Sequence, residues 1–211
     1  MLAERGHRVT AVDIPQSNYA PFREFPVQDY DGRNLPFEDG TFDIVFSSNV
    51  LEHVPHLDEL NREIARVLRS GGRAIHVLPS ASWQALNLAL HIPALARDAL
   101  RLLTARKAGG AATPKEPCTR AQARLTDRAL RRVLPHRHGE HGNALTELYL
   151  FSRFHWHLLF RATGFVDVRR YGSRLAYSGY MLVGRHLSLS ARSRLSRLVG
   201  SSCHVFVMTK P

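Results

Sequence analysis

The sequence predicts an α/β protein built on a doubly wound, mostly parallel sheet. Apolar strand candidates lie at 7–14, 43–48 and 73–79, a helix candidate separates the last two, and an irregular crossover separates the first two. Alternation of this kind is typical of parallel sheets. The 211 residues suffice for a domain of ordinary size, and 44% hydrophobic residues is typical of a globular chain.

The first elements follow from local signals. Residues 2–6 read as the end of a helix that Gly6 stops in a C-cap position. The run 7–14 is apolar and partly β-branched, as expected for a strand buried on both faces. Three prolines make 15–26 irregular, and a short strand is expected at 27–30.

The strand and helix that follow are the strongest local pattern. Residues 43–48 form a continuous apolar strand candidate. Asp58 is expected to be the N-cap of a helix over 57–70, whose apolar residues fall at helical spacing. The pair Gly71–Gly72 is expected to end this helix before the strand at 73–79.

Beyond residue 80 the composition changes, and the elements are predicted in a looser order. The expected elements are a Leu/Ala-rich helix (83–104), a loop (105–117), a basic amphipathic helix (119–133), a loop (135–143), an aromatic-rich helix (146–163), a strand (164–171), a short basic helix (190–198) and a final strand (203–209).

Two runs carry an ordered motif: LPFEDGTFDIVFSSNVLEHV (35–54) and LNREIARVLRSGGRAIHVLP (60–79). The order is LPF, then FD with a buried strand, then LEH, then a helix ending RVLxxGG, then another strand. This pattern resembles the class I S-adenosylmethionine (SAM)-dependent methyltransferases, especially the small-molecule branch. The resemblance implies a Rossmann-like fold, SAM as cofactor and methyl transfer as the reaction.

The resemblance also assigns the nucleoside half of a SAM site. Asp13, at the carboxyl end of the first strand, would accept hydrogen bonds from the ribose hydroxyls, although a capping aspartate is the structural alternative. Asp31 would accept from the adenine amino group, with Asp29 as its rival. Gly32 would let the backbone approach the ring.

The methionine half is assigned to Ser47, Ser48 and Asn49, because ligands of open α/β sheets bind beyond the carboxyl ends of strands. His53 of the LEH element follows, either to shape this pocket or to act as a general base. Asp43 starts the same strand at the opposite end and is expected to be structural.

Further base candidates lie in the loop around residue 138. His138 and His141 are the expected bases if this loop covers the pocket, and an ordinary surface loop is the alternative. Three histidines within six residues, from His136 to His141, also raise the question of a metal. Their spacing fits no standard structural site, so no metal is expected.

The resemblance implies that the first strand and the glycine-rich loop that open this fold would precede residue 1, so both are expected to be missing from this chain. The lost strand would lie between strands 7–14 and 43–48, so these two are expected either to expose unpaired edges or to pair directly. A late start assignment and a truncated remnant are the competing explanations. The expected organisation is a partial SAM-binding core (1–80), a helical lid insertion (83–145) and a C-terminal part that completes the sheet (146–211).

Charge is unevenly placed along the chain. Residues 1–80 carry a net charge of −4 (8 Lys/Arg, 12 Asp/Glu), and residues 81–211 carry +15 (21 and 6). The basic half favours a small-molecule, glycan or lipid-linked acceptor and peripheral contact with an anionic membrane surface. RNA methylation is the less favoured reading, because no RNA-binding module is recognised. Solvated arginines are the plain alternative.

The cellular setting is inferred from what the sequence contains. Cys118 and Cys203 are far apart and lack metal-ligand spacing, which is typical of reduced thiols in a cytoplasmic protein. No apolar run reaches the roughly 18 residues of a membrane span. The sequence indicates no oligomeric state. A non-catalytic remnant or interaction module of the same fold remains the alternative to an enzyme.

Overall fold

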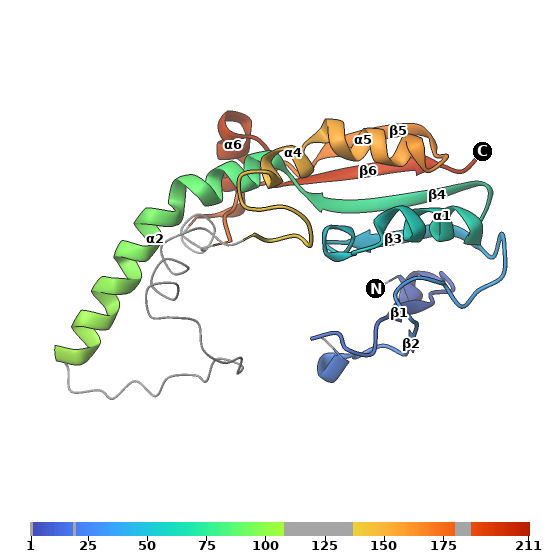
Figure 1. Cartoon of the computed structure of the whole chain (residues 1–211), viewed down its shortest axis with the longest axis horizontal. Coiled ribbons are helices and arrows are strands. Elements are labelled where there is room, and N and C mark those ends of the chain that lie inside the picture. Colours follow the sequence, from blue (N-terminus) through green and yellow to red (C-terminus); the bar gives the residue numbers. More distant parts are fainter. Residues whose placement is uncertain (1, 19, 108–136, 180–186) are drawn as a thin grey trace. The chain divides into compact units, whose positions relative to one another are not determined.

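The computed structural model describes residues 2–18, 20–107, 137–179 and 187–211, which fall into two compact units. The first unit comprises Met1–Val77, His157–Arg170 and Phe206–Pro211. The second comprises Leu78–Trp156 and Tyr171–Val205. Figure 1 labels their helices and strands. Each unit is described in turn.

The first unit begins with a short turn and a two-stranded parallel sheet. The 3-10 turn η1 (Ala3–Arg5) ends at Gly6, which adopts a left-handed φ of 85° and donates its N–H to the carbonyl of Ala3. This confirms the predicted helix stop. Strands β1 (Ala11–Asp13) and β2 (Val27–Asp29) pair in parallel with Asp13 opposite Asp29. A 3-10 turn, η2 (Ala20–Phe22), lies between them.

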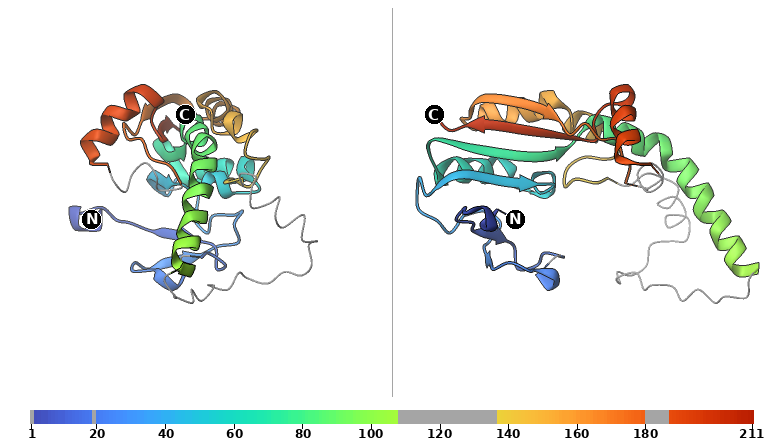
Figure 2. Two further views of the ribbon diagram at one scale, coloured as in Figure 1. Left: turned by 90° about the vertical axis from the view of Figure 1, so that its left-hand side faces the viewer. Right: turned by 180° about the vertical axis from the view of Figure 1, so that it is seen from behind.

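The larger sheet, most of which belongs to the first unit, has four strands in the order β3-β4-β6-β5, as the right-hand view of Figure 2 shows. Their bounds are Phe42–Ser48 (β3), Leu68–Pro79 (β4), Val166–Gly172 (β5) and Cys203–Thr209 (β6). Strands β3 and β4 are parallel, with Ser47 opposite His76. Strand β6 runs opposite to β4 (Figure 1). The α/β class with a parallel-containing sheet is confirmed.

The two sheets share no strand in the described part of the chain. Strand β1 pairs with β2, and β3 pairs with β4, but β1 and β3 do not pair with each other in the described part of the chain. Of the two outcomes expected from the sequence, the structure therefore shows the first, in which β3 stands at the edge of its sheet.

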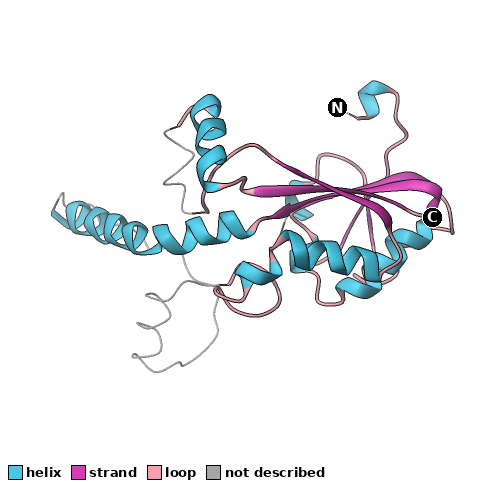
Figure 3. Cartoon of the chain, turned by 90° about the horizontal axis from the view of Figure 1, so that it is seen from above, coloured by secondary structure: helices cyan, strands magenta, loops and turns pink. Residues whose placement is uncertain are grey.

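The two faces of the larger sheet differ in burial. Helices α1 (Leu57–Val67) and α5 (Arg153–Ala162) lie on the same side of this sheet (Figure 3). On that side His76 is fully buried and stacks on Phe160, with ring centroids 5.6 Å apart. Along β3, by contrast, Ile44 and Phe46 are 54% and 58% exposed. Because they alternate with half-buried Val45, they occupy the other face.

Helix α1 departs from the prediction at both ends. Its N-cap is His56, with no side-chain cap, so Asp58 lies inside the first turn and the predicted Asp58 cap is wrong. The helix ends at Val67 rather than at the glycines, and β4 begins at Leu68. Gly71 donates its N–H to Lys210, and Gly72 accepts from Lys210. Both glycines therefore belong to β4, where they form hydrogen bonds with the residue that follows β6.

The second unit contains the 27-residue helix α2 (Ala81–Lys107) and the one-turn helix α4 (Glu147–Leu150). The single helix predicted over 146–163 is wrong, because the chain breaks between α4 and α5. At the break the carbonyl of Phe151 accepts from Ala81 N–H, and the hydroxyl of Ser152 accepts from His155 N–H at 3.2 Å. Ser152 thus caps the start of α5.

The last helix of the second unit is α6 (Leu189–Val199), as predicted for 190–198. Ser188 caps it by accepting from the N–H of Ala191 at 3.2 Å, and Gly200 follows it with a φ of 89°. None of the helices in the described segments combines the length and apolar content needed to span a bilayer.

Candidate functional site

Two acidic residues at the ends of β1 and β2 share one arginine. Arg23 donates from Nη1 to Asp29 Oδ1 at 2.8 Å, and its Nη2 lies 3.5 Å from Asp13 Oδ2. The other oxygen of Asp13 accepts from the N–H of Ile14 at 2.9 Å. The Asp13 side chain stays 35% exposed. It is therefore held in place by Arg23 and remains accessible to a ligand at the strand end.

Asp31 organises the turn that follows β2. Its Oδ1 accepts from the backbone N–H of Arg33 and of Asn34, at 2.8 and 2.7 Å, and its Oδ2 accepts from Asn34 Nδ2 at 2.8 Å. The Asn34 side chain, followed by these N–H groups, lowers the pKa of the Asp31 carboxyl. Gly32 has a φ of 83° within this turn. Of the two rivals, Asp31 therefore caps a turn, whereas Asp29 forms an ion pair.

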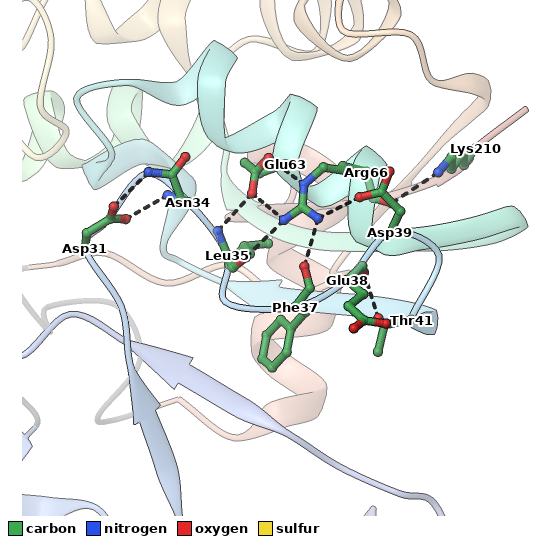
Figure 4. Close-up of polar contacts among 10 residues, drawn as sticks. All are labelled: Asp31, Asn34, Leu35, Phe37, Glu38, Asp39, Thr41, Glu63, Arg66 and Lys210. Atoms are coloured by element: carbon green, nitrogen blue, oxygen red, sulfur yellow. Dashed lines mark hydrogen bonds and ion pairs between the residues drawn. The ribbon is translucent and has the colours of Figure 1, made fainter.

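The LPFEDG loop is fixed to α1 by one arginine (Figure 4). Arg66 donates to the carbonyls of Leu35 and Phe37, at 3.0 and 2.8 Å, and to Asp39 Oδ1 at 2.8 Å. The Glu63 carboxylate binds the same guanidinium and accepts from the N–H of Leu35 at 2.9 Å. Two motifs that lie far apart in the sequence are thus joined by one network of hydrogen bonds directly before β3.

The carboxyl end of β3 holds Ser47, Ser48 and Asn49. Ser47 Oγ and His76 Nδ1 are 2.7 Å apart across the parallel pair. Asn49 has a left-handed φ of 51° and donates its N–H to the carbonyl of Val77 at 2.8 Å. A non-glycine residue in this region is uncommon, and asparagine tolerates it better than most. The β3 end is therefore a sharp, fixed turn.

His76 supports this end of the sheet and does not act as a base. Burial lowers the pKa of its imidazole to about 3. A histidine that stays neutral at physiological pH and is such a weak base activates a hydroxyl poorly. The hydrogen-bonded Ser47–His76 pair is therefore a structural pair and not a hydrolytic dyad.

The LEH element forms the 3-10 turn η3 (Leu51–His53) directly after β3. The Glu52 carboxylate is buried, and burial raises its pKa to about 7. His53 Nε2 lies 3.9 Å from Glu52 Oε1, and the His53 side chain is 46% exposed. The turn therefore carries one exposed imidazole next to one carboxyl whose charge changes near neutral pH.

The remaining predicted bases belong to the second unit. His138 and His141 are exposed, and the His138 ring lies 4.7 Å from that of Trp83. Their loop is held by buried Glu147, which accepts from the N–H groups of His138 and Gly139 at 2.6 and 2.7 Å. The histidines predicted to be catalytic are thus divided between the two units. His136, Cys118 and the predicted basic helix at 119–133 lie outside the described residues.

Sequence reasoning did not single out several residues of these sites, among them Arg66, Glu63, His76 and Glu52. The Glu63–Arg66 spacing of three on a helix was a usable signal for a pair. His76 in an apolar strand and Glu52 inside a motif gave no local signal, because their burial depends on tertiary packing.

Comparison with known proteins agrees with the N-terminal motifs. The family model described as "Methyltransferase domain" matches residues 1–76. The chain is 40% identical over 78 residues to the biotin biosynthesis bifunctional protein BioHC of Cellvibrio japonicus, covering 35% of this chain and 16% of that protein. It is 44% identical over 45 residues to the sterol 4-C-methyltransferase strm-1 of Caenorhabditis elegans, covering 21% of this chain and 14% of that protein. The chain thus spans a minor part of these relatives.

Among solved structures, a SAM-dependent methyltransferase from Mesorhizobium loti aligns with a TM-score of 0.49 at 11% identity, over 99% of this chain and 84% of that one. The family match instead falls on the part of the chain that carries the ordered strand-end motifs and the Arg66-anchored loop. Residues 1–76 of this chain therefore resemble a methyltransferase domain.

Proposed function

We propose that this protein transfers a methyl group from SAM to a small-molecule, glycan or lipid-linked acceptor. The observation that carries the proposal is the coincidence of the family match over 1–76 with accessible polar residues at the carboxyl ends of β1 and β3. In open α/β sheets this is the edge where ligands bind.

The nucleoside half of SAM is the part that the described residues fit best. Asp13 is held by Arg23 yet partly exposed, so it can accept from ribose hydroxyls. Asp31 Oδ2 accepts one hydrogen bond within its turn and retains capacity for another. The turn at Gly32 lets a planar ring approach the backbone.

The methionine half and the acceptor are proposed to meet at the β3 end. Ser47, Ser48 and Asn49 would orient the methionine part, with Asn49 fixed by its bond to Val77. Bound SAM would supply an activated methyl group, so holding the acceptor in line is the main requirement on the protein. For a hydroxyl acceptor, His53 is the exposed group on this turn that can take the proton.

Isothermal titration with SAM tests the proposal. We expect saturable binding by the wild-type chain and at least about tenfold weaker binding by Asp13→Asn, because two ribose hydrogen bonds to a charged acceptor are weakened. Asp43→Asn is the matched control: Asp43 lies at the other end of β3 and pairs with Arg69 at 2.8 Å. Its affinity should equal that of the wild type. Equal losses in both variants would contradict the assigned site.

A non-catalytic role is the second candidate, and one observation favours it. Strand β3 is an edge strand whose Ile44 and Phe46 are more than half exposed. Such a surface is typical of a binding module or of a domain that lacks a covering element. A chain that is folded by circular dichroism but shows no heat of SAM binding would favour this second function.

A further inference from the structure

The C-terminal part of the chain carries positive charge without acidic residues. After Asp167, residues 168–211 contain eight Lys/Arg and no Asp or Glu. A segment of one charge sign attracts polyanions and holds no carboxylate of its own to neutralise its arginines. Helix α6 is the helix of this segment that the structure describes.

Helix α6 presents arginine and leucine side chains to solvent on one face. Arg194, Arg197 and Leu198 are spaced by three and four residues, so they lie on the same side of the helix. All three are exposed, and Leu198 is 85% exposed. The exposed face of α6 therefore combines two guanidinium groups with one apolar side chain.

The opposite side of α6 is anchored within the second unit. Arg192 donates from Nε to the carbonyl of Ala176 at 3.2 Å, and its guanidinium lies 5.5 Å from the ring centroid of Tyr177. Ser196 is buried on the same side. Because Arg192 is used internally while Arg194 and Arg197 are not buried, the exposed face has a fixed orientation in its unit.

We propose that this face of α6 docks on an anionic phospholipid surface. The guanidinium groups of Arg194 and Arg197 would bind lipid phosphates, and Leu198 would leave water for the headgroup–acyl boundary. A nucleic acid would satisfy the two arginines equally well, but Leu198 would stay in water. The apolar contribution therefore favours a membrane. The inference is independent of the proposed methyl transfer, because it involves no cofactor and no residue of the first unit.

Co-sedimentation with vesicles tests the proposal on the full chain. The probes are phosphatidylcholine vesicles with and without about 30 mol% phosphatidylserine, at about 0.1 M salt. We expect wild-type binding to the anionic vesicles and at least about tenfold less to the neutral ones. Arg194→Gln with Arg197→Gln should weaken binding about thirtyfold, which corresponds to about fivefold for each arginine. Leu198→Ser should weaken it about tenfold.

The matched control is Arg161→Gln with Arg169→Gln, which removes the same charge from two exposed positions of the first unit. It should change vesicle binding less than about threefold. Circular dichroism checks that each variant is folded. Equal losses in the control and the α6 variant overturn the proposal, as does equal binding to both vesicle types. Binding to a single-stranded RNA without binding to either vesicle would also overturn it and assign the face to nucleic acid.

Discussion

Arg66 binds both carboxylate oxygens of Glu63, from Nε to Oε1 and from Nη2 to Oε2, each at 2.7 Å. The pair lies on α1, and the same guanidinium holds the carbonyls of Leu35 and Phe37. The Arg66 side chain lowers the pKa of the Glu63 carboxyl, and Glu63 raises the pKa of Arg66. One planar five-donor group therefore fixes a loop to a helix.

Replacing Arg66 should destabilise the first unit. Arg66→Ala removes a bidentate pair and two bonds to backbone carbonyls, so we expect a loss of about 3 kcal/mol in the free energy of unfolding. Arg66→Lys keeps the charge but loses the planar pair of donors that binds both oxygens of Glu63. It should lower the free energy of unfolding by about half as much. Urea unfolding measures both. Arg62→Ala, at an exposed position of the same helix, should cost no more than about 0.5 kcal/mol; a similar loss there would refute the special role of Arg66.

Several elements of the fold were predicted correctly from local sequence patterns, because their bounds depend on neighbouring residues. The strand β3, the strand β6 and the helix α6 lie within one residue of their predicted bounds. Helix α1 ended early because the Gly71–Gly72 segment pairs with Lys210, a contact of high sequence separation. The break between α4 and α5 likewise depends on Ala81 binding the Phe151 carbonyl. The periodicity of apolar residues does not reveal hydrogen-bond partners that lie far apart in the sequence.

Sequence motifs located the candidate residues at the strand ends. They could not identify residues whose role depends on burial in the folded chain. Asp13 and Ser47 lie at strand ends as predicted. Local patterns could not show that Asp31 uses both carboxylate oxygens within its own turn. Nor did they show that Ser47 binds His76, because the register of two parallel strands sets that contact.

The buried carboxyl of Glu52 should make stability fall with rising pH. Its pKa is raised from an ordinary 4.5 to about 7, so the folded state binds a proton that the unfolded state has lost. The stabilisation is complete below pH of about 4.5 and is lost as the pH rises to about 7. Glu52→Gln should remove this loss. Its free energy of unfolding relative to that of the wild type should therefore rise by about 2 kcal/mol from pH 5 to about 8. Thermal melts at both pH values measure it; an equal shift at both would contradict the pKa.

The buried imidazole of His76 has the opposite pH dependence. Its pKa is lowered from 6.5 to about 3, so the stability that it contributes is present above 6.5 and is lost as the pH falls towards 3. His76→Asn keeps a partner for Ser47 and removes the titration. We expect a lower Tm at pH 7 but a smaller further decrease from pH 6 to about 4. Exposed His157→Asn is the control, and should melt with the wild-type pH dependence.

The uncovered face of β3 should govern self-association. Phe46 is 58% exposed on an edge strand, whereas Phe206 on β6 is fully buried. Phe46→Lys places a charge on that edge and should reduce aggregation, with a change in unfolding free energy below about 0.5 kcal/mol. Phe206→Lys buries a charge and should prevent folding. Light scattering and circular dichroism distinguish them. Undiminished scattering by Phe46→Lys would show that this face does not drive association.

Glu147 should determine the order of the loop that carries His138. Its buried carboxylate accepts two backbone N–H groups of the loop through Oε1 and the Gln84 side chain through Oε2 at 2.9 Å. Glu147→Ala leaves three donors, two of them buried, without this acceptor, so we expect a loss of about 3 kcal/mol. Cleavage at Arg137 by trypsin should be faster in this variant, because loop opening precedes cleavage. Glu140→Ala, exposed in the same loop, is the matched control. Equal cleavage rates in the two variants would place the anchor of the loop elsewhere.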